Sequence, residues 1–193
     1  PRWVRPERSS QRSVAEQFKQ VDLPTLEPNI MQQQFIANFN ELRANQAKRG
    51  LLISATGTGK TYAAAFAMRE MNPKRILFLV HREQIAKQAM ASFERVYNDP
   101  SITFGLVSGN VKKYDATHVF STMQMMGRYD VMKQYDPTTF DCIIIDEVHR
   151  AGSESYQRII DYFKPQFLLG MTASPERTDG YDLYELFDHN IIY

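Results

Sequence analysis

Residues 51–61, LLISATGTGKT, contain the pattern that decides the fold: three apolar residues, a turn with two glycines, and a lysine followed by a threonine. Leu51–Ile53 predict a short buried strand, and the residues from Ala63 to Met71 predict a helix that begins near Lys60. A glycine-rich turn between a strand and a helix is the context in which backbone N–H groups bind phosphate. The stretch therefore predicts a phosphate-binding loop.

Each residue of this turn has an expected role. Gly57 and Gly59 let the backbone wrap, so that successive N–H groups point at β-phosphate oxygens, and the following helix adds its positive end. Lys60 is expected to reach the β- and γ-phosphates, and the Thr61 hydroxyl to bind Mg²⁺. The strict pattern has glycine where Ser54 stands, and an ordinary turn before a helix is the alternative. The expected nucleotide-binding residues of the loop are Thr56, Gly57, Thr58, Gly59, Lys60 and Thr61.

Short apolar runs alternate with helical patterns along the whole chain. The further expected strands are residues 75–80, 102–107, 118–120, 142–145 and 167–171, and the further expected helices are residues 31–49, 83–97, 123–134 and 153–163. Because the runs are apolar throughout, the strands should be buried on both faces, which is typical of a parallel sheet between helices. The sequence predicts an α/β fold with a mainly parallel sheet and helices on both faces.

Length and composition indicate a globular chain of one domain. The 193 residues are 43% apolar and 23% charged, with a net charge of +1, so binding to nucleic acid would need a local basic patch. A single cysteine excludes an intrachain disulfide, and no apolar run is long enough to predict a membrane span. We expect a cytoplasmic protein, with a basic arm at residues 1–27 that includes a short helix and a folded lobe at 28–193. Because the chain lacks an initiator Met, we expect it to be cut from a longer protein.

An acidic pair, Asp146 and Glu147, follows the apolar run at residues 142–145. Ligands of open parallel sheets bind at the carboxyl ends of the strands, so we expect this pair and Lys60 to converge at neighbouring strand ends. Asp146 is expected to hold Mg²⁺, and Glu147 to orient and deprotonate a water that attacks the γ-phosphate. Taken alone, the pair could be a solvated strand end; together with the phosphate-binding loop, it predicts catalysis.

Three segments together resemble the DEAD/DEAH-box helicases and translocases of superfamily 2: GTGKT at 57–61, DEVH at 146–149 and TAS at 172–174. HREQI at 81–85 and TASPERTDG at 172–180 resemble the branch that contains the motor subunits of type I and type III restriction enzymes. The resemblance covers about residues 28–180. It implies a RecA-like P-loop fold, ATP and Mg²⁺ as ligands, and ATP hydrolysis coupled to movement on nucleic acid.

The resemblance also implies roles outside the loop and the acidic pair. Gln32 matches the position that recognises adenine, although Gln33 and Gln34 leave the register open and a polar helix face is the alternative. A surface arginine at position 82 and a structural histidine at position 149 are further alternatives. The implied nucleic-acid contacts are His81, Arg82, Ser121, Thr122 and Gln124, and the implied coupling residues are His149, Thr172 and Ser174.

In this family the motor has a second RecA-like lobe, whose arginines reach the γ-phosphate. No such segment follows Ser174 here, so we expect the isolated lobe to bind ATP–Mg²⁺ weakly and to hydrolyse it slowly. The resemblance favours DNA over RNA, with nuclease or restriction-system subunits as candidate partners. The alternatives are a catalytically silent nucleotide- or DNA-binding module and another P-loop enzyme, such as a small-molecule kinase. The full set Lys60, Thr61, Asp146 and Glu147 favours an enzyme.

Overall fold

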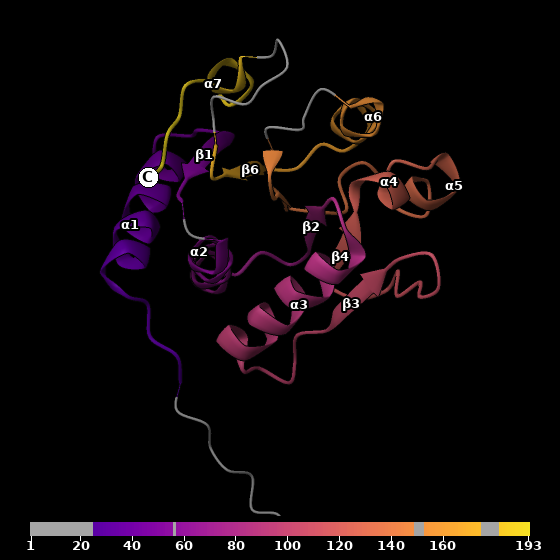
Figure 1. The fold of residues 1–193 in the computed structure, drawn as a ribbon, viewed down its shortest axis with the longest axis horizontal. Coiled ribbons are helices and arrows are strands. Elements are labelled where there is room, and N and C mark those ends of the chain that lie inside the picture. Colours follow the sequence, from indigo (N-terminus) through magenta and orange to yellow (C-terminus); the bar gives the residue numbers. More distant parts are fainter. Residues whose placement is uncertain (1–24, 56, 149–152, 175–181) are drawn as a thin grey trace, which may run out of the picture.

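The structure is a computed structural model that describes residues 25–55, 57–148, 153–174 and 182–193. Its centre is a six-stranded, all-parallel sheet with the order β1-β6-β5-β2-β4-β3 (Figure 1). The strands are β1 Arg49–Ile53, β2 Ile76–Val80, β3 Phe104–Val107, β4 His118–Thr122, β5 Cys142–Ile145 and β6 Phe167–Thr172. The helices are α1 Ile30–Ala44, α2 Gly57–Met71, α3 Glu83–Tyr97, α4 Met123–Met126, α5 Tyr129–Met132, α6 Glu154–Tyr162 and α7 Leu183–Leu186. The predicted α/β class and parallel sheet are confirmed.

The sheet separates two apolar cores. One core lies under α1, α2 and α3 and includes Phe78 and Ile144, whereas the other lies under α4 to α7 and includes Leu77 and Ile143 (Figure 1). Neighbouring residues of one strand thus point into opposite cores, as the period of two in a strand requires. This arrangement explains why the strand sequences are apolar throughout.

The largest differences from the predictions lie in the first helix, in residues 123–134 and in α7. The first helix ends at Ala44 rather than near residue 49, because Gln46 has a positive φ of 63° and the chain turns there into β1. The helix predicted at 123–134 is two single turns, α4 and α5, separated at Gly127. A Cβ at Gly127 would lie 3.0 Å from that of Ser155, so the glycine permits close packing at the start of α6. Helix α7 was not predicted.

The C-terminal residues form an additional pairing along the free side of β1. The Leu51 N–H donates to the Asn190 carbonyl at 2.8 Å, and the Ile53 N–H donates to the Tyr193 carbonyl at 3.0 Å. Ile192 between them is buried, at 1% exposure. The edge of the sheet next to the phosphate-binding loop is therefore covered by the chain's own last residues.

Two expectations are not tested by this fold. The short helix expected within residues 1–27 falls largely outside the described residues, and the domain boundary at residue 28 stays a prediction. Among the described residues, no helix combines the length and the apolar character that a membrane crossing requires.

Candidate nucleotide-binding and nucleic-acid-binding site

The carboxyl ends of β1, β6 and β5 bring the predicted loop and the acidic pair together. Strand β6 lies between β1 and β5, so the two strand ends are not neighbours as predicted but are separated by one strand. Ile53 at the end of β1 pairs with Thr172, and Ile145 at the end of β5 pairs with Gly170. The order of the strands thus places β6, with Thr172 at its end, between the loop and the carboxylates.

The side chains of Lys60 and Glu147 are in contact at the carboxyl ends of the strands. The Lys60 ammonium donates to Glu147 Oε1 at 3.1 Å. The Lys60 side chain is 1% exposed, whereas the Glu147 side chain is 39% exposed. Because burying an unpaired ammonium group is costly, the carboxylate of Glu147 is the group that makes the buried position of Lys60 tolerable.

Helix α2 begins at Gly57, three residues earlier than predicted, so the second half of the glycine turn lies in its first helical turn. The first N–H groups of a helix have no partner within the helix, and they point along its axis towards the preceding loop. The arrangement agrees with phosphate binding by this loop. Thr56 and the side chain of Thr58 lie outside the described part of the chain, so their predicted contacts stay predictions.

The acidic pair is held by its own backbone. The Asp146 N–H donates to the Leu79 carbonyl at 2.9 Å, and Asp146 Oδ1 accepts from the Glu147 N–H at 2.9 Å. Glu147 has a positive φ of 53°, a conformation that non-glycine residues seldom adopt outside functional sites and turns. This turn directs the Glu147 carboxylate to Lys60, while Asp146 stays anchored at the end of β5.

Burial raises the pKa of Asp146 above its usual value, and the neighbouring charge of Glu147 raises it further. The Lys60 ammonium and the Glu147 N–H oppose this rise, since both favour the ionised carboxylate. A further positive charge at this position would stabilise the carboxylate in the same way. The site is therefore electrostatically suited to a cation next to Asp146.

Thr172 and Ser174 are the two predicted coupling residues that the structure describes, and they lie between the loop and the acidic pair. The Ser54 N–H donates to the Thr172 carbonyl at 3.0 Å, and Thr172 Oγ1 accepts from the Ser174 N–H at 3.1 Å. Thr172 is fully buried. Sequence reasoning treated Ser54 only as a departure from the glycine pattern, whereas its backbone joins the loop to β6. His149 lies outside the described residues, and its coupling role stays a prediction.

The predicted nucleic-acid contacts follow two neighbouring strands. His81 and Arg82 come after β2, and Gln124 follows β4, which pairs with β2 through Val80 and Thr122. Arg82 and Gln124 are exposed, as contact with a phosphate backbone requires. Their location at the carboxyl ends of two neighbouring strands is consistent with a single binding surface, and contact with nucleic acid stays a prediction.

Ser121 and Thr122 are less accessible than Gln124. Ser121 is fully buried and its hydroxyl donates to the Thr122 carbonyl at 3.2 Å. Thr122 caps α4, since its Oγ1 accepts from the Met125 N–H at 3.1 Å. Of these three predicted contacts, only Gln124 presents an exposed side chain in this conformation.

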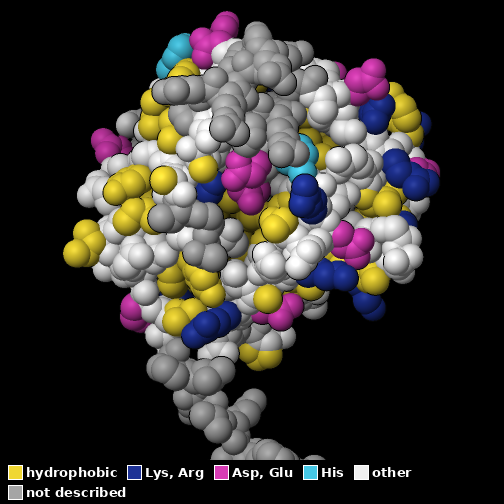
Figure 2. Space-filling model, viewed as in Figure 1, with side chains coloured by type: hydrophobic (Ala, Val, Ile, Leu, Met, Phe, Trp, Pro, Cys, Tyr) yellow, Lys and Arg dark blue, Asp and Glu magenta, His cyan; other side chains and the backbone are white. Residues whose placement is uncertain are grey.

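A hollow of about 240 Å³ joins the acidic pair to the segment after β2. It is lined by His81 and Arg82 on one side and by Asp146 and Glu147 on the other. Figure 2 shows acidic side chains near the centre of the visible face, with a histidine and basic side chains beside them. Two of the candidate nucleic-acid residues, His81 and Arg82, therefore share one hollow with the candidate catalytic carboxylates.

Gln32 has a structural role at the start of α1. Its Oε1 accepts from the Asn29 N–H at 2.9 Å, and Asn29 Oδ1 accepts from the Gln32 N–H at 2.9 Å, which is a reciprocal capping box. Gln33 instead donates to the Pro28 carbonyl from an exposed position. The cap fixes the Gln32 side chain, and recognition of adenine by its amide stays a prediction.

Comparison with known proteins identifies the relatives of this chain. The type I restriction enzyme EcoAI endonuclease subunit of Escherichia coli is 33% identical over 166 residues, 78% of this chain and 20% of that protein. The DNA 3'-5' translocase XPB2 of Sulfurisphaera tokodaii is 27% identical over 147 residues, 76% of this chain and 32% of that protein. The chain thus spans less than a third of the length of either relative.

The fold has close structural counterparts. The UvsW helicase from bacteriophage T4 superimposes with a TM-score of 0.66 at 21% identity, over 86% of this chain and 60% of that one.

Residues 25–177, which include the loop, the acidic pair and Thr172, match the family described as "Type III restriction enzyme, res subunit". The resemblance inferred from the short motifs is confirmed, and the chain belongs to the type III restriction enzyme res-subunit family.

Proposed function

We propose that this chain is the ATP-binding first lobe of a DNA-dependent ATPase that acts as a helicase or translocase. The observation that carries the proposal is the 3.1 Å contact between Lys60 and Glu147, which unites the phosphate-binding loop with the acidic pair. The relative named a DNA translocase and the relative named a restriction endonuclease subunit support DNA as the nucleic acid. The reaction is the hydrolysis of ATP to ADP and phosphate, coupled to movement.

ATP binding exchanges the partner of Lys60. In the structure the ammonium contacts Glu147, and the β- and γ-phosphates take over this contact when ATP occupies the loop. The exchange releases the Glu147 carboxylate, which then orients a water molecule in line with the γ-phosphate and accepts its proton. The buried position of Lys60 is preserved because one negative partner replaces another.

The residues at this edge suit Mg²⁺. Thr61 lies next to Lys60 in the first turn of α2, and Asp146 lies next to Glu147, so a hydroxyl and a carboxylate oxygen are available on the two sides of the Lys60–Glu147 contact. Oxygen ligands in small number are what Mg²⁺ uses when it also binds substrate phosphates. When bound, the ion neutralises charge on the β- and γ-phosphates.

Nucleic acid binds over the exposed side chains of Arg82 and Gln124, with His81 beside them. These side chains contact phosphates rather than bases, so binding tolerates many sequences and weakens as salt rises. A second RecA-like lobe closes over ATP and the strand, and Thr172 and Ser174 transmit the change between the two sites. Nuclease or restriction-system subunits are the expected assembly partners, as the relatives' names suggest.

Nucleotide binding by the chain tests the first part of the proposal. A fluorescent ATP analogue with Mg²⁺ should bind the chain, and Lys60→Met should abolish binding while the fold stays intact by circular dichroism. Lys87→Met is the matched control, because Lys87 on α3 is exposed and pairs with Glu83 on its own helix. Equal binding by wild type and Lys60→Met would refute the phosphate-binding role of Lys60.

Hydrolysis tests the catalytic part, in the longest protein that contains this chain. Glu147→Gln should keep ATP binding and lower DNA-stimulated turnover about 10²–10⁴-fold, the usual contribution of a positioned general base. Turnover that is unchanged by Glu147→Gln would refute the catalytic role of Glu147. Absence of turnover from the wild type while ATP still binds would favour the alternative of a catalytically silent binding module.

A further inference from the structure

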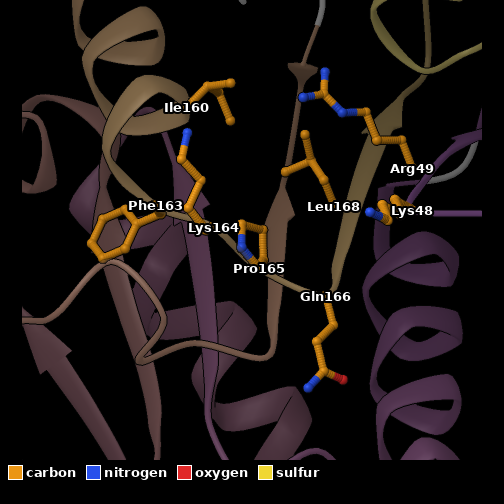
Figure 3. A pocket seen from close by; sticks show the side chains of 8 residues that line it. All are labelled: Lys48, Arg49, Ile160, Phe163, Lys164, Pro165, Gln166 and Leu168. Carbon is orange, nitrogen blue, oxygen red and sulfur yellow. The ribbon is translucent and has the colours of Figure 1, made fainter.

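A second and larger hollow lies at the amino ends of the strands, where β1 and β6 begin and α6 ends (Figure 3). Its volume is about 550 Å³. Arg49 pairs with Leu168 at these amino ends, whereas Ile53 pairs with Thr172 at the carboxyl ends, next to the phosphate-binding loop. Four residues of strand separate the two ends, a distance of about 13 Å. The hollow is therefore a separate site from the candidate nucleotide site.

The walls of this hollow combine apolar surface with positive charge. The apolar surface comes from Leu168 on β6, from Ile160 in the last turn of α6 and from Phe163 directly after that helix. Three cations line the hollow: Lys48 directly before β1, Arg49 at its start, and Lys164 after α6. No Asp or Glu is among the described residues that line it.

Arg49 is held in place by the fold. One of its terminal nitrogens donates to the Leu186 carbonyl at 3.1 Å, and its own carbonyl accepts from the Asn190 side chain at 2.9 Å. The residue is half-buried, so its guanidinium is fixed more firmly than that of a surface arginine. A guanidinium held in one orientation is well suited to a carboxylate or a phosphate, since little side-chain freedom is lost on binding.

Lys164 provides a second cation on the opposite side of the hollow. Its ammonium donates to the Asp161 carbonyl from an exposed position and is able to turn to a ligand. In Figure 3 the charged ends of Arg49 and Lys164 extend in the same direction, and Ile160 and Leu168 lie between them in this view. The Gln166 side chain extends the opposite way.

We propose that this hollow binds a small organic anion: a carboxylate or phosphate group carried on an aromatic or aliphatic body. The anionic group contacts Arg49 and Lys164, and the apolar body packs on Ile160 and Leu168. The volume falls within the roughly 300–1,000 Å³ that is usual for small-molecule sites, which also combine apolar walls with a few polar groups. The site is independent of ATP hydrolysis and goes beyond the function proposed above.

Phenyl phosphate is a suitable probe, because it combines a phosphate with a flat apolar ring. Titration should shift the methyl NMR signals of Ile160 and Leu168 in a saturable way at millimolar concentrations. Phenol lacks the charge and inorganic phosphate lacks the ring, so each should bind at least about tenfold more weakly, given the strength of charge-assisted hydrogen bonds. Saturable shifts with phenyl phosphate alone support the proposal.

Variants locate the binding. Arg49→Gln and Lys164→Met should each weaken phenyl phosphate binding about tenfold, whereas Gln166→Ala should leave it unchanged. Lys164 is exposed, so its replacement tests the site without risk to folding. Lys60→Met separates this site from the phosphate-binding loop: shifts at Ile160 and Leu168 should persist in that variant.

Three results would overturn the proposal. The first is the absence of saturable shifts at Ile160 and Leu168 up to tens of millimolar phenyl phosphate. The second is wild-type affinity in both Arg49→Gln and Lys164→Met. The third is loss of the shifts in Lys60→Met, which would assign them to the phosphate-binding loop. None of these results bears on ATP hydrolysis, so the function proposed above would stand or fall separately.

Discussion

The Lys60 ammonium and the Glu147 carboxylate lie 3.1 Å apart although 87 positions separate them in the sequence, and their exposures differ strongly. The lysine is almost completely buried, whereas more than a third of the glutamate side chain reaches solvent. In the folded chain the Glu147 carboxylate therefore already has access to water, whereas the Lys60 ammonium has almost none and depends more on its partner. The two residues of this pair should not contribute equally to stability.

This asymmetry predicts different effects of the two truncations on the free energy of unfolding. Glu147→Ala leaves a buried ammonium without its partner and should cost about 1–3 kcal/mol. Lys60→Met keeps the buried volume and leaves a hydrated carboxylate, so it should cost less than about 1 kcal/mol. Urea unfolding measures both values. Lys87→Ala, in the exposed pair with Glu83, is the control and should change stability by about 0.5 kcal/mol or less. Equal losses at Lys60 and Glu147 would contradict the burial difference.

A second prediction concerns the buried histidine of β4. His118 is 1% exposed and packs edge-on against Tyr97 and Phe104, with ring centroids 5.1 and 5.3 Å away. Burial lowers the pKa of His118 to about 4, and a hydrogen bond with Thr117 only partly opposes this. The unfolded chain, with a pKa near 6.5, therefore binds a proton at pH values where the folded chain does not.

Stability should consequently fall as the pH drops from about 6.5 to about 4, by up to about 3 kcal/mol from this residue. Above pH 6.5 both states hold a neutral ring, and the contribution of His118 no longer depends on pH. Unfolding by urea at several pH values measures the slope, and His118→Phe should reduce it because a phenyl ring keeps the packing without a proton. Identical pH slopes for wild type and His118→Phe would show that another group dominates.

The strands and the two chemical motifs were predictable from the sequence because their signals are local. Runs such as Cys142–Ile145 are apolar at every position, and Asp146 and Glu147 follow one of them directly. The order of the strands was not predictable, since the position of β6 between β1 and β5 depends on packing of segments far apart in the sequence. The neighbouring strand ends expected for Lys60 and Asp146 were therefore wrong, although their convergence was right.

Other parts of the fold were not predicted, for different reasons. The first helix was predicted too long because Gly50 is the first residue after it that typically ends a helix, whereas the chain turns at Gln46. The capping box of Asn29 and Gln32 does have a local signal, because an N-cap residue three positions before a glutamine is typical of a helix start, but it was not predicted. The C-terminal pairing with β1 was missed because residues 190–193 are too few to show a period, so only the tertiary structure shows what they cover.

Close packing at β6 gives a third prediction. A Cβ at Gly170 would lie 2.4 Å from the ring of Phe187, which is fully buried. Gly170→Ala should therefore lower the free energy of unfolding by about 1–3 kcal/mol, the usual cost of overpacking a core. Gly109→Ala is the control, because among the described residues none beyond its two chain neighbours has an atom within 4 Å of the added Cβ. A second change, Phe187→Leu, should offset part of the loss in Gly170→Ala; a purely additive loss would contradict the contact.

The C-terminal pairing with β1 gives the last prediction. Ile192 is buried and lies against Gly50, where a Cβ would come within 2.6 Å of its methyl group, whereas the neighbouring Ile191 is 50% exposed. Ile192→Ala should cost about 2–4 kcal/mol, as truncation of a buried isoleucine does, and Ile191→Ala should cost less than about 1 kcal/mol. The same change should speed hydrogen exchange at the N–H groups of Leu51 and Ile53, which donate to the Asn190 and Tyr193 carbonyls. Since Ile53 directly precedes the phosphate-binding loop, loosening this pairing should also weaken binding of the fluorescent ATP analogue. Unchanged exchange at Leu51 and Ile53 in Ile192→Ala would show that β1 holds its position without the C-terminal residues.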